Sequence, residues 1–444
     1  MALPLRQAQG RLSEFPLENR TRMSSQAQER IPKVGMFAAL ESQNFRRFWY
    51  SALGQSAAMG MQTLTISWLI LELTGSKAQF GISVFLQGLP MSIAVIFGGM
   101  LADRMNRVRL IQTGQIVNLV LLTLLGVLVL MRHIRVWQVY LIIPLIGTFQ
   151  GLANSSRGPL VNDLVERKDI MNAVSLNSML MNITQIAGPS AAGFIISAVG
   201  VGPSLLINAS LYSISIFWLS RIKYERKKPV NLRKPLKDLV EGMRYVKSVP
   251  AIFGIITIGC IMGLFAHPAQ QMVPVLVKDE FGLGARAAGF LLMSAGIGAL
   301  IGNVALASLG AKVNKNAVLL TTGATYAIGI WAMAASPWYA SSLVALFLMG
   351  LSRSVFVSVG STLLQLIAHK DYLGKSLSWW NVGGSFPFVG AMPLGFLADE
   401  IGLRTAIAVW LMVYVAVFIW VGLIGTGIRK IEAAPKTAEV AVRA

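Results

Sequence analysis

Twelve long apolar runs dominate this sequence and constrain its fold more than any other feature. Each has at least twenty residues, about the length that an α-helix needs to cross the ~30 Å hydrocarbon core of a bilayer. The runs cover residues 48–73, 78–102, 109–132, 137–162, 172–199, 201–221, 251–277, 284–309, 316–336, 338–367, 373–398 and 402–427. Only 13% of the residues are charged, whereas soluble domains carry about a quarter. We therefore predict an all-α integral membrane protein with twelve transmembrane helices.

The basic residues indicate how these helices are oriented. The 39 Lys and Arg exceed the 19 Asp and Glu and give a net charge of +20, which in a soluble protein would suggest a nucleic-acid ligand. Here the bases lie in short loops between the apolar runs. Six of the 39 lie on the far side of the membrane and two lie away from the ends of their runs, which leaves 31 on the side that holds both termini. The positive-inside rule therefore predicts that both termini are cytoplasmic, with the lipid bilayer and no nucleic acid as partner.

Polar segments divide the chain into two halves. We predict a disordered cytoplasmic tail over residues 1–45, six-helix halves over 46–221 and 251–428, a cytoplasmic loop over 222–250 and a second cytoplasmic tail over 429–444. Apolar residues recur at helical spacing in the second part of the loop, which predicts an amphipathic helix on the inner membrane face.

An internal repeat supports this division. Three glycines recur 202 residues later in the chain, as Gly188 and Gly390, Gly193 and Gly395, and Gly200 and Gly402. Two structurally repeated halves that face one another across a central site are typical of transporters. We therefore predict two pseudo-symmetric halves.

A charged turn joins the second and third apolar runs. Its sequence, Gly99-Met-Leu-Ala-Asp-Arg-Met-Asn-Arg-Val-Arg109, resembles the loop signature of the major facilitator superfamily. Asn106 stands where the family usually has glycine, and asparagine is the best substitute in a left-handed turn. An ordinary cytoplasmic loop, held inside by its arginines, is the alternative.

The resemblance implies that this turn is a cytoplasmic gate. The resemblance also implies that Asp103 interacts with the amino end of the eleventh helix and with the arginines of the loop. We also expect Arg107 to pair with Asp163 or Glu166, at the inner end of the fourth run. The predicted gate residues are Gly99, Asp103, Arg104, Arg107 and Asp163.

A second motif lies in the fifth run. Gly188-Pro189, followed by Gly193, resembles the Gly-Pro-x-x-Gly-Gly signature of antiporting members of the superfamily, with Ala192 in place of one glycine. Close packing of helices through small residues is the alternative explanation. We favour the antiporter interpretation because the gate motif is also present.

Further segments resemble one bacterial branch of the superfamily, the enterobactin-exporter and macrolide-efflux-like group. They begin at Asn44, Trp68, Gly98 and Asn172, and the likeness extends from about residue 38 to residue 427. It implies a non-enzymatic secondary transporter that exports a drug-like compound or siderophore across the inner membrane of a bacterium by alternating access. Energy would come from proton exchange, without a cofactor or metal, and we expect a monomer to suffice. A proton symporter, importer or uniporter of the same fold for an organic anion is the alternative.

Polar side chains inside the apolar runs suggest the transport site. Facing lipid would cost such groups several kcal/mol each, so we expect them to face the interior. In the superfamily, helices one, four, seven and ten line the central cavity, and these runs carry the candidates Gln55, Met59, Gln62, Gln150, Asn154, Arg157, His267, Gln271 and Arg353. Hydrogen bonds that only hold the bundle together are the alternative.

The charges among these candidates favour an anionic substrate. Two arginines and a histidine lie away from the ends of their runs, but no carboxylate lies at mid-span. His267 titrates in a useful range and is a candidate proton carrier, although a structural role is equally open. The single cysteine, Cys260, argues against a disulfide framework or a cysteine metal cluster. No His/Glu or Ser/His/Asp cluster suggests an enzyme.

Overall fold

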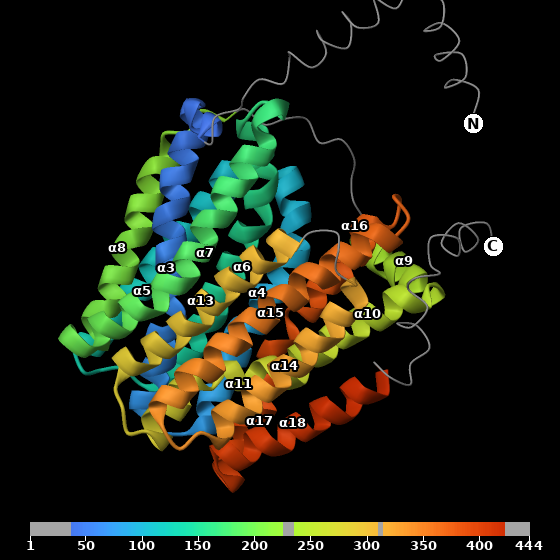
Figure 1. The fold of residues 1–444 in the computed structure, drawn as a ribbon. Helices are drawn as coiled ribbons and strands as arrows, with labels where there is room; N and C mark the ends of the chain where they lie inside the picture. The colour runs from blue at the N-terminus through green and yellow to red at the C-terminus, as the bar shows by residue number, and fades with distance from the viewer. Residues whose placement is uncertain (1–36, 225–234, 310–313, 422–444) are drawn as a thin grey trace, which may run out of the picture.

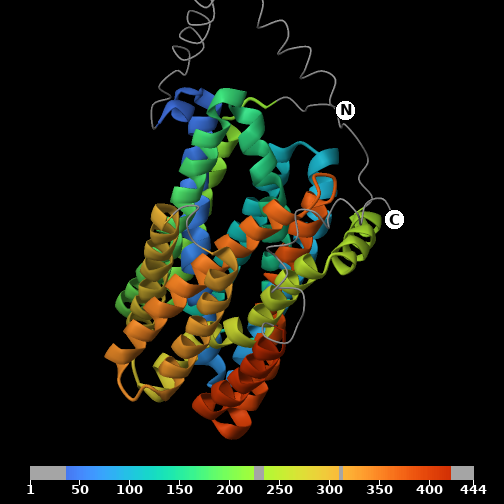
Figure 2. The ribbon, with the colours of Figure 1, turned by 45° about the vertical axis from the view of Figure 1, so that its right-hand side comes forward.

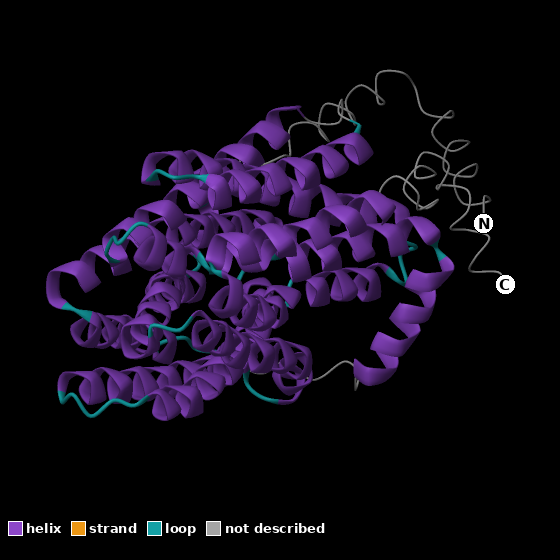
Figure 3. Cartoon of the chain, turned by 90° about the horizontal axis from the view of Figure 1, so that it is seen from below, coloured by secondary structure: helices purple, strands orange, loops and turns teal. Residues whose placement is uncertain are grey.

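The computed structural model describes residues 37–224, 235–309 and 314–421, and this part of the chain consists of helices joined by short loops (Figure 3). The all-α prediction is confirmed. The predictions for residues 1–36 and 429–444 lie outside the described residues.

The N-terminal group of helices is drawn blue to green in Figure 1. It contains α3 (Gln43–Thr74), α4 (Lys77–Arg104), α5 (Arg107–Leu130), α6 (Val136–Leu164), α7 (Ile170–Val199) and α8 (Val201–Ser220). Within it, α4 packs on α6, α5 packs on α6 and α8, and α3 packs on α7 and α8.

The C-terminal group is drawn yellow to red beside it (Figures 1 and 2). It contains α10 (Pro250–Ile261), η3 (Met262–Ala266), α11 (His267–Gln271), α12 (Val273–Val275), η4 (Leu276–Glu280), α13 (Ala285–Leu309), α14 (Lys315–Ala335), α15 (Tyr339–Ile367), α16 (Leu373–Gly383), α17 (Phe386–Ile401) and α18 (Leu403–Ile419). Here α13 and α14 pack on α15, and α18 packs on α14 and α17.

Two of the predicted transmembrane helices are interrupted. The run over 251–277 begins as α10, widens into the π-helical turn η3 and continues through two short helices that begin just before Pro268 and Pro274. Proline removes a backbone donor and clashes with the preceding turn, so a regular helix does not continue through it. The run over 373–398 breaks between α16 and α17, just before Pro387.

Nine helical stretches in the described part are long and apolar enough to cross a membrane, and α18 is a shorter apolar helix. Helix α3 is long enough but is not among the nine, and it buries several polar residues. Helices α16 and α17 are each too short to count alone. Twelve spans therefore stay a prediction, although helices occupy every predicted run.

Side-chain caps determine where two helices of the N-terminal half begin. The Ser76 hydroxyl accepts a hydrogen bond from the backbone N–H of Gln79 at the start of α4. The Asn106 side chain does the same for Arg109 at the start of α5, which satisfies a free backbone donor. Asn106 has φ −68° and ψ 117°, so the predicted left-handed turn there is wrong: asparagine acts as a cap.

The predicted disordered tail ends earlier than residue 45. The short 3₁₀ helix η1 (Ala38–Glu41) lies against α7, and the Ala39 backbone N–H donates to the Asn172 side chain at 3.1 Å. Phe45 is fully buried in the N-terminal half. Burial of these apolar groups orders the segment.

The two halves meet along two helix pairs, α4 with α17 and α7 with α13. Glycines allow the close approach in both pairs. A Cβ added at Gly395 would strike α4 near Lys77, and one at Gly289 would lie 2.7 Å from the carbonyl oxygen of Pro189. These contacts lie in the part of the helices that the charge pattern predicts to be the outer side.

Helix α9 (Pro235–Ser248) belongs to the predicted cytoplasmic loop and packs on α16 and α10. Lys375 of α16 forms an ion pair with Glu241 at 2.6 Å, and the rings of Tyr245 and Tyr372 stack with centroids 4.3 Å apart. Part of the amphipathic helix is thus attached to the C-terminal half. Residues 225–234 lie outside the described part.

Candidate functional site

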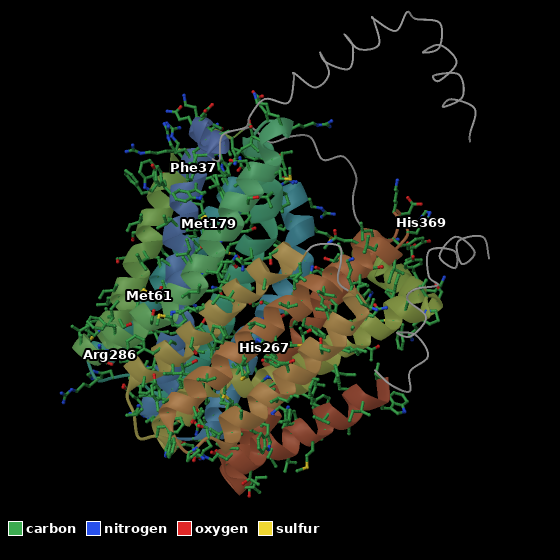
Figure 4. The ribbon with its side chains drawn as sticks, viewed as in Figure 1. Phe37, Met61, Met179, His267, Arg286 and His369 are labelled. Atoms are coloured by element: carbon green, nitrogen blue, oxygen red, sulfur yellow. The ribbon has the colours of Figure 1, made fainter. Side chains whose placement is uncertain are left out.

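A cavity with a volume of about 970 Å³ lies between the two halves. Its walls come from α4 of the N-terminal half and from α10, η3, α11, α15, α16 and α17 of the C-terminal half. It extends from His267 and Arg353 in the middle of the molecule to Gly99 and Gly374, near the inner ends of α4 and α16. In Figure 4, His267 lies near the centre of the molecule.

Most of the cavity wall is apolar and aromatic. The rings of Phe356 and Trp380 both line it and stack with centroids 6.0 Å apart. Glycine at position 360 makes room for Trp380, because a Cβ there would overlap the indole ring. A few polar groups in an apolar pocket are typical of small-molecule sites.

Arg353 supplies the charge in the deep part of this cavity. It makes no hydrogen bond or ion pair with any other residue in the described chain. His267 and Tyr326 lie close enough to Arg353 to interact with it electrostatically. In the described chain, Nδ1 of His267 has no hydrogen-bond partner. The deep part of the cavity thus offers donors and positive charge.

The other charged groups of the cavity wall lie toward its inner end. Lys375 is paired with Glu241. Asp371 is the one carboxylate on the described wall; it is 79% exposed, in the loop before α16, and stands 3.4 Å from Nδ1 of His369. Neither of these groups forms a hydrogen bond or ion pair with Arg353 in the described chain.

The structure separates the other predicted cavity residues from this wall. Gln55, Met59, Gln62, Gln150, Asn154, Arg157 and Gln271 are not among the residues that line it. Gln55, Gln62, Gln150 and Arg157 are instead buried. The polar sides of α3 and α6 turn toward α5 and α8 of the same half, so their burial does not place them against the opposite half.

A polar cluster results inside the N-terminal half. Gln115 donates to Gln55 at 2.8 Å, and Tyr212 donates to Gln62 at 3.0 Å. Arg157 lies near Tyr212, is only 5% exposed, and has no hydrogen-bond partner for any of its three guanidinium nitrogens. These contacts fit the bundle-holding alternative for the amides, but leave Arg157 unexplained.

The predicted gate residues lie at the inner end of the N-terminal half. Arg107 pairs with Asp163 at 2.5 Å, one of its two predicted partners, whereas Glu166 pairs with Lys168. Gly99 lines the cavity and Arg104 is exposed. The side chain of Asp103 lies outside the described structure, although its backbone belongs to α4.

Tyr224 adds a further contact to this inner cluster. Its hydroxyl donates to Asp163 at 2.8 Å. Burial, followed by the hydrogen bond to Asp163, raises the pKa of Tyr224 to about 12. The phenol therefore remains a neutral donor at physiological pH and completes a contact between α6 and the segment after α8.

The antiporter-like motif has two different surroundings. A Cβ at Gly188 would lie 2.6 Å from the Cα of Gly60, so this glycine permits close contact between α7 and α3. A Cβ at Gly193 would overlap the carbonyl oxygen of Ala285 in α13, and Pro189 faces Gly289. The motif thus packs both within one half and between the halves.

The outer ends of the halves are tied together by polar contacts. The Asp399 carboxylate, at the end of α17, accepts hydrogen bonds from the Ser76 hydroxyl at 2.6 Å and from the backbone N–H groups of Lys77 and Ala78 at 2.8 and 3.0 Å. An ion pair joins the Lys77 side chain to Asp279 at 3.4 Å. The outer side is therefore closed while the cavity reaches the inner ends.

Asp399 follows directly after the predicted run over 373–398 and is not among the predicted site residues. A signal was present, because Gly395-Phe-Leu-Ala-Asp399 repeats the pattern of Gly99-Met-Leu-Ala-Asp103 at the opposite ends of two paired helices. The repeat becomes interpretable once α4 is seen to pack on α17, because the two motifs then lie at opposite ends of one helix pair.

Residues 34–439 match a protein family described as transmembrane secretion effectors, which belongs to the major facilitator superfamily. The chain is a member of this family. Its relatives among known proteins include the enterobactin exporter EntS of Escherichia coli strain 536, with 26% identity over 358 residues that cover 80% of this chain and 85% of the relative. EntS of Shigella flexneri is 25% identical over 358 residues, which cover 80% and 84% of the two chains.

Solved transporter structures share the fold of this secretion effector. A bacterial homologue of the human lysosomal transporter Spinster, in an inward-facing and unoccupied conformation, superposes with a TM-score of 0.69 at 14% identity, over 88% of this chain and 98% of the other. The nucleoside transporter NupG gives a TM-score of 0.70 at 12% identity, over 87% and 99%. The secretion effector is thus a multi-pass membrane protein whose family and fold are those of transporters.

Proposed function

We propose that this secretion effector exports a small amphipathic organic anion from the cytoplasm by alternating access, in exchange for protons. The observation that carries the proposal is the cavity, which reaches the inner ends of α4 and α16 while polar contacts close the outer ends. Similarity to enterobactin exporters supports the direction of transport.

The chemistry of the cavity supports the substrate class. Its deep part combines the unpaired Arg353 with an apolar wall that includes Phe356 and Trp380. Arginine presents five fixed N–H donors to a carboxylate or similar acceptor. An aromatic or apolar body with one acidic group would satisfy both surfaces.

Exchange for protons requires a group that changes its protonation. His267 shares the cavity with Arg353, and its Nδ1 is without a hydrogen-bond partner. Exchange also requires that His267 is neutral while the anion is carried outward and protonated on the return, because a proton carried together with the anion would be cotransport. Arg353 disfavours a second positive charge beside it, so the proton would leave for the cytoplasm before the anion binds. His267 is thus our proposed coupling residue.

The test uses inside-out membrane vesicles that contain the protein and a trapped pH-sensitive dye. Three compounds with one naphthalene body are compared: 2-naphthoate, 2-naphthamide and 2-naphthylmethylammonium. We expect the carboxylate to release protons from energised vesicles, and Arg353→Gln or His267→Gln to abolish this release. Arg286→Gln, a matched loss of charge on the outer surface beside Phe194, serves as the control.

The other results discriminate between the alternatives. Proton release by the cation alone would reject the anion class but keep proton-coupled export. Uptake of labelled 2-naphthoate into whole cells, without proton movement in vesicles, would favour an importer or uniporter of the same fold. If no compound moves protons while the protein is folded and abundant, proton exchange is rejected.

A further inference from the structure

We propose that Asp399 and residues Ser76, Lys77 and Ala78 form a latch that holds the outer side of the transporter closed. We call these four residues the outer latch. The inference rests on the alternating access proposed above, because it assigns a residue that determines the balance between its two states.

The geometry of the outer latch is that of a carboxylate seated on a helix start. One oxygen of Asp399 accepts from the N–H of Lys77, and the other accepts from the N–H of Ala78 and the hydroxyl of Ser76. The first N–H groups of a helix have no partner within the helix, and its dipole favours a negative charge there. The contact is therefore electrostatically favourable, and its three hydrogen bonds fix how the carboxylate is oriented on the start of α4.

Asp399 lies at a position in its own helix that disfavours its negative charge. It lies at the carboxyl end of α17, where the helix dipole disfavours a negative charge. Glu400, the next residue, lies at the same end, is exposed, and has no hydrogen bond or ion pair in the described chain. The favourable partner of Asp399 is thus the opposite half of the protein, and the neighbouring acid shares its position without that partner.

The repeated motif has an aspartate, Asp103, at the equivalent sequence position of α4. Asp399 contacts the start of α4, so α4 and α17 run in opposite directions, and Asp103 near the end of α4 belongs to the inner side. Here Gly99 and Gly374 stand on the wall of the cavity, and neither has any atom within 4 Å of an added Cβ. The inner ends are therefore apart while the outer latch is closed.

Two latches of this kind would work in opposition. A contact made in one conformation only shifts the equilibrium toward that conformation by its differential free energy. The outer latch stabilises the state that is open to the cytoplasm. Closure of the inner side requires the carboxylate of Asp399 to leave the start of α4.

Distances between spin labels test this without any substrate. In a Cys260→Ser background, one label pair at His133 and Ala340 reports the outer ends, and a second pair at Lys168 and Lys370 reports the inner ends. The protein is purified in lipid nanodiscs. In the protein with the outer latch intact, we expect most molecules to show a short distance between the outer labels and a long distance between the inner labels.

Asp399→Asn should raise the ratio of outer-open to outer-closed protein by roughly tenfold, as expected for one charge at a helix end. The inner distance should shorten in the same fraction of molecules. Ser76→Ala removes the 2.6 Å hydrogen bond to Asp399 but keeps the negative charge of Asp399 and the dipole of α4. It should shift the ratio in the same direction by a smaller factor. Asp103→Asn combined with Asp399→Asn should return the ratio toward that of the unchanged protein.

Glu400→Gln is the matched control, since it removes one negative charge at the neighbouring position. An unchanged ratio in both Asp399→Asn and Ser76→Ala would overturn the latch, as would an equal shift in Glu400→Gln. If Asp399→Asn fails to fold, Ser76→Ala alone decides. Because no transported compound is involved, a shifted ratio in a protein that exports nothing would reject the proposed function and leave the latch intact.

Discussion

Arg353 brings an unpaired positive charge into the cavity, and its effect on charge selectivity can be measured directly. Val357 lies one helical turn away, lines the same cavity and is 43% exposed. In a Cys260→Ser background, Val357→Cys gives a single reactive thiol. We expect it to react faster with an anionic methanethiosulfonate than with a cationic one, and Arg353→Gln should lower this rate ratio by about tenfold.

The matched control for this measurement is Arg286→Gln, which should leave the ratio unchanged because Arg286 lies on the outer surface (Figure 4). A ratio that is insensitive to Arg353→Gln would show that other groups determine the potential of the cavity. The anionic substrate class would then lose its main support.

Arg157 is the same type of residue in a different environment. Its guanidinium group is buried inside the N-terminal half without a hydrogen-bond partner. A buried charged group of this kind costs more than the ~1–3 kcal/mol of an unsatisfied neutral one. We expect Arg157→Met, of similar length, to keep or raise the midpoint of thermal unfolding of the purified protein.

A marked fall in that midpoint would mean that Arg157 has a structural partner, such as a buried water. Loss of transport in a stabilised Arg157→Met variant would indicate a functional role for which stability is sacrificed. The comparison variant is Arg353→Met, which should change stability little because the cavity already exposes the group.

At the scale of helices, the two glycines of the fifth-helix motif should differ in their effects. Gly188 faces Gly60 within one half, whereas Gly193 faces Ala285 in the other half. We expect Gly188→Ala to lower the thermal unfolding midpoint, since overpacking costs typically 1–3 kcal/mol. Gly193→Ala should instead favour the outer-open state, because separating the halves relieves the overlap.

The label pairs described above distinguish these outcomes. Gly193→Ala should lengthen the outer distance with a smaller change in unfolding midpoint than Gly188→Ala. If both substitutions only destabilise the protein, α7 and α13 do not separate during the cycle. Gly200→Ala, at a left-handed position with φ 85° and no neighbour within 4 Å, provides a control for backbone strain alone.

Two interrupted helices lie beside the cavity. The breaks at η3 and between α16 and α17 both border the cavity, near Gly263 and Ser385. Discontinuous helices leave backbone groups free beside a central site, an arrangement that transporters use for binding. Neither break can be read from hydropathy, since both lie within continuous apolar runs.

At the scale of the whole molecule, the closed outer side predicts one-sided access. Ser378→Cys places a thiol on the cavity wall, again in a Cys260→Ser background. A membrane-impermeant maleimide should label it in inside-out vesicles and much less in intact cells. Trp338→Cys, in an exposed loop of the predicted outer side, should show the reverse pattern.

Equal labelling of Ser378→Cys from both sides would mean that the outer side opens frequently. If Ser378→Cys is labelled mainly in intact cells and Trp338→Cys mainly in inside-out vesicles, the membrane orientation is opposite to the one that the basic loops predict. Addition of 2-naphthoate provides a further comparison, because a transported compound should change access from the inner side.

The sequence alone determined the class of fold and the family. Apolar runs long enough to span a bilayer form helices, because a helix satisfies every backbone hydrogen bond within the segment. The turn from Gly99 to Arg109 supplied the resemblance to the superfamily. The helix breaks, the ordered segment at Ala38–Glu41 and the capping role of Asn106 were not anticipated. Each depends on a local contact that hydropathy does not record.

The tertiary structure decided which polar residues meet. Arg157 and Arg353 look equivalent in sequence, since each is a lone arginine in an apolar helix, yet one faces its own half and the other faces the cavity. The rotation of a helix about its axis depends on the side chains of its neighbours, which interlock through long-range packing. The contact of Asp399 with the start of α4 joins residues more than three hundred positions apart, so only the packed arrangement of the two halves could reveal it.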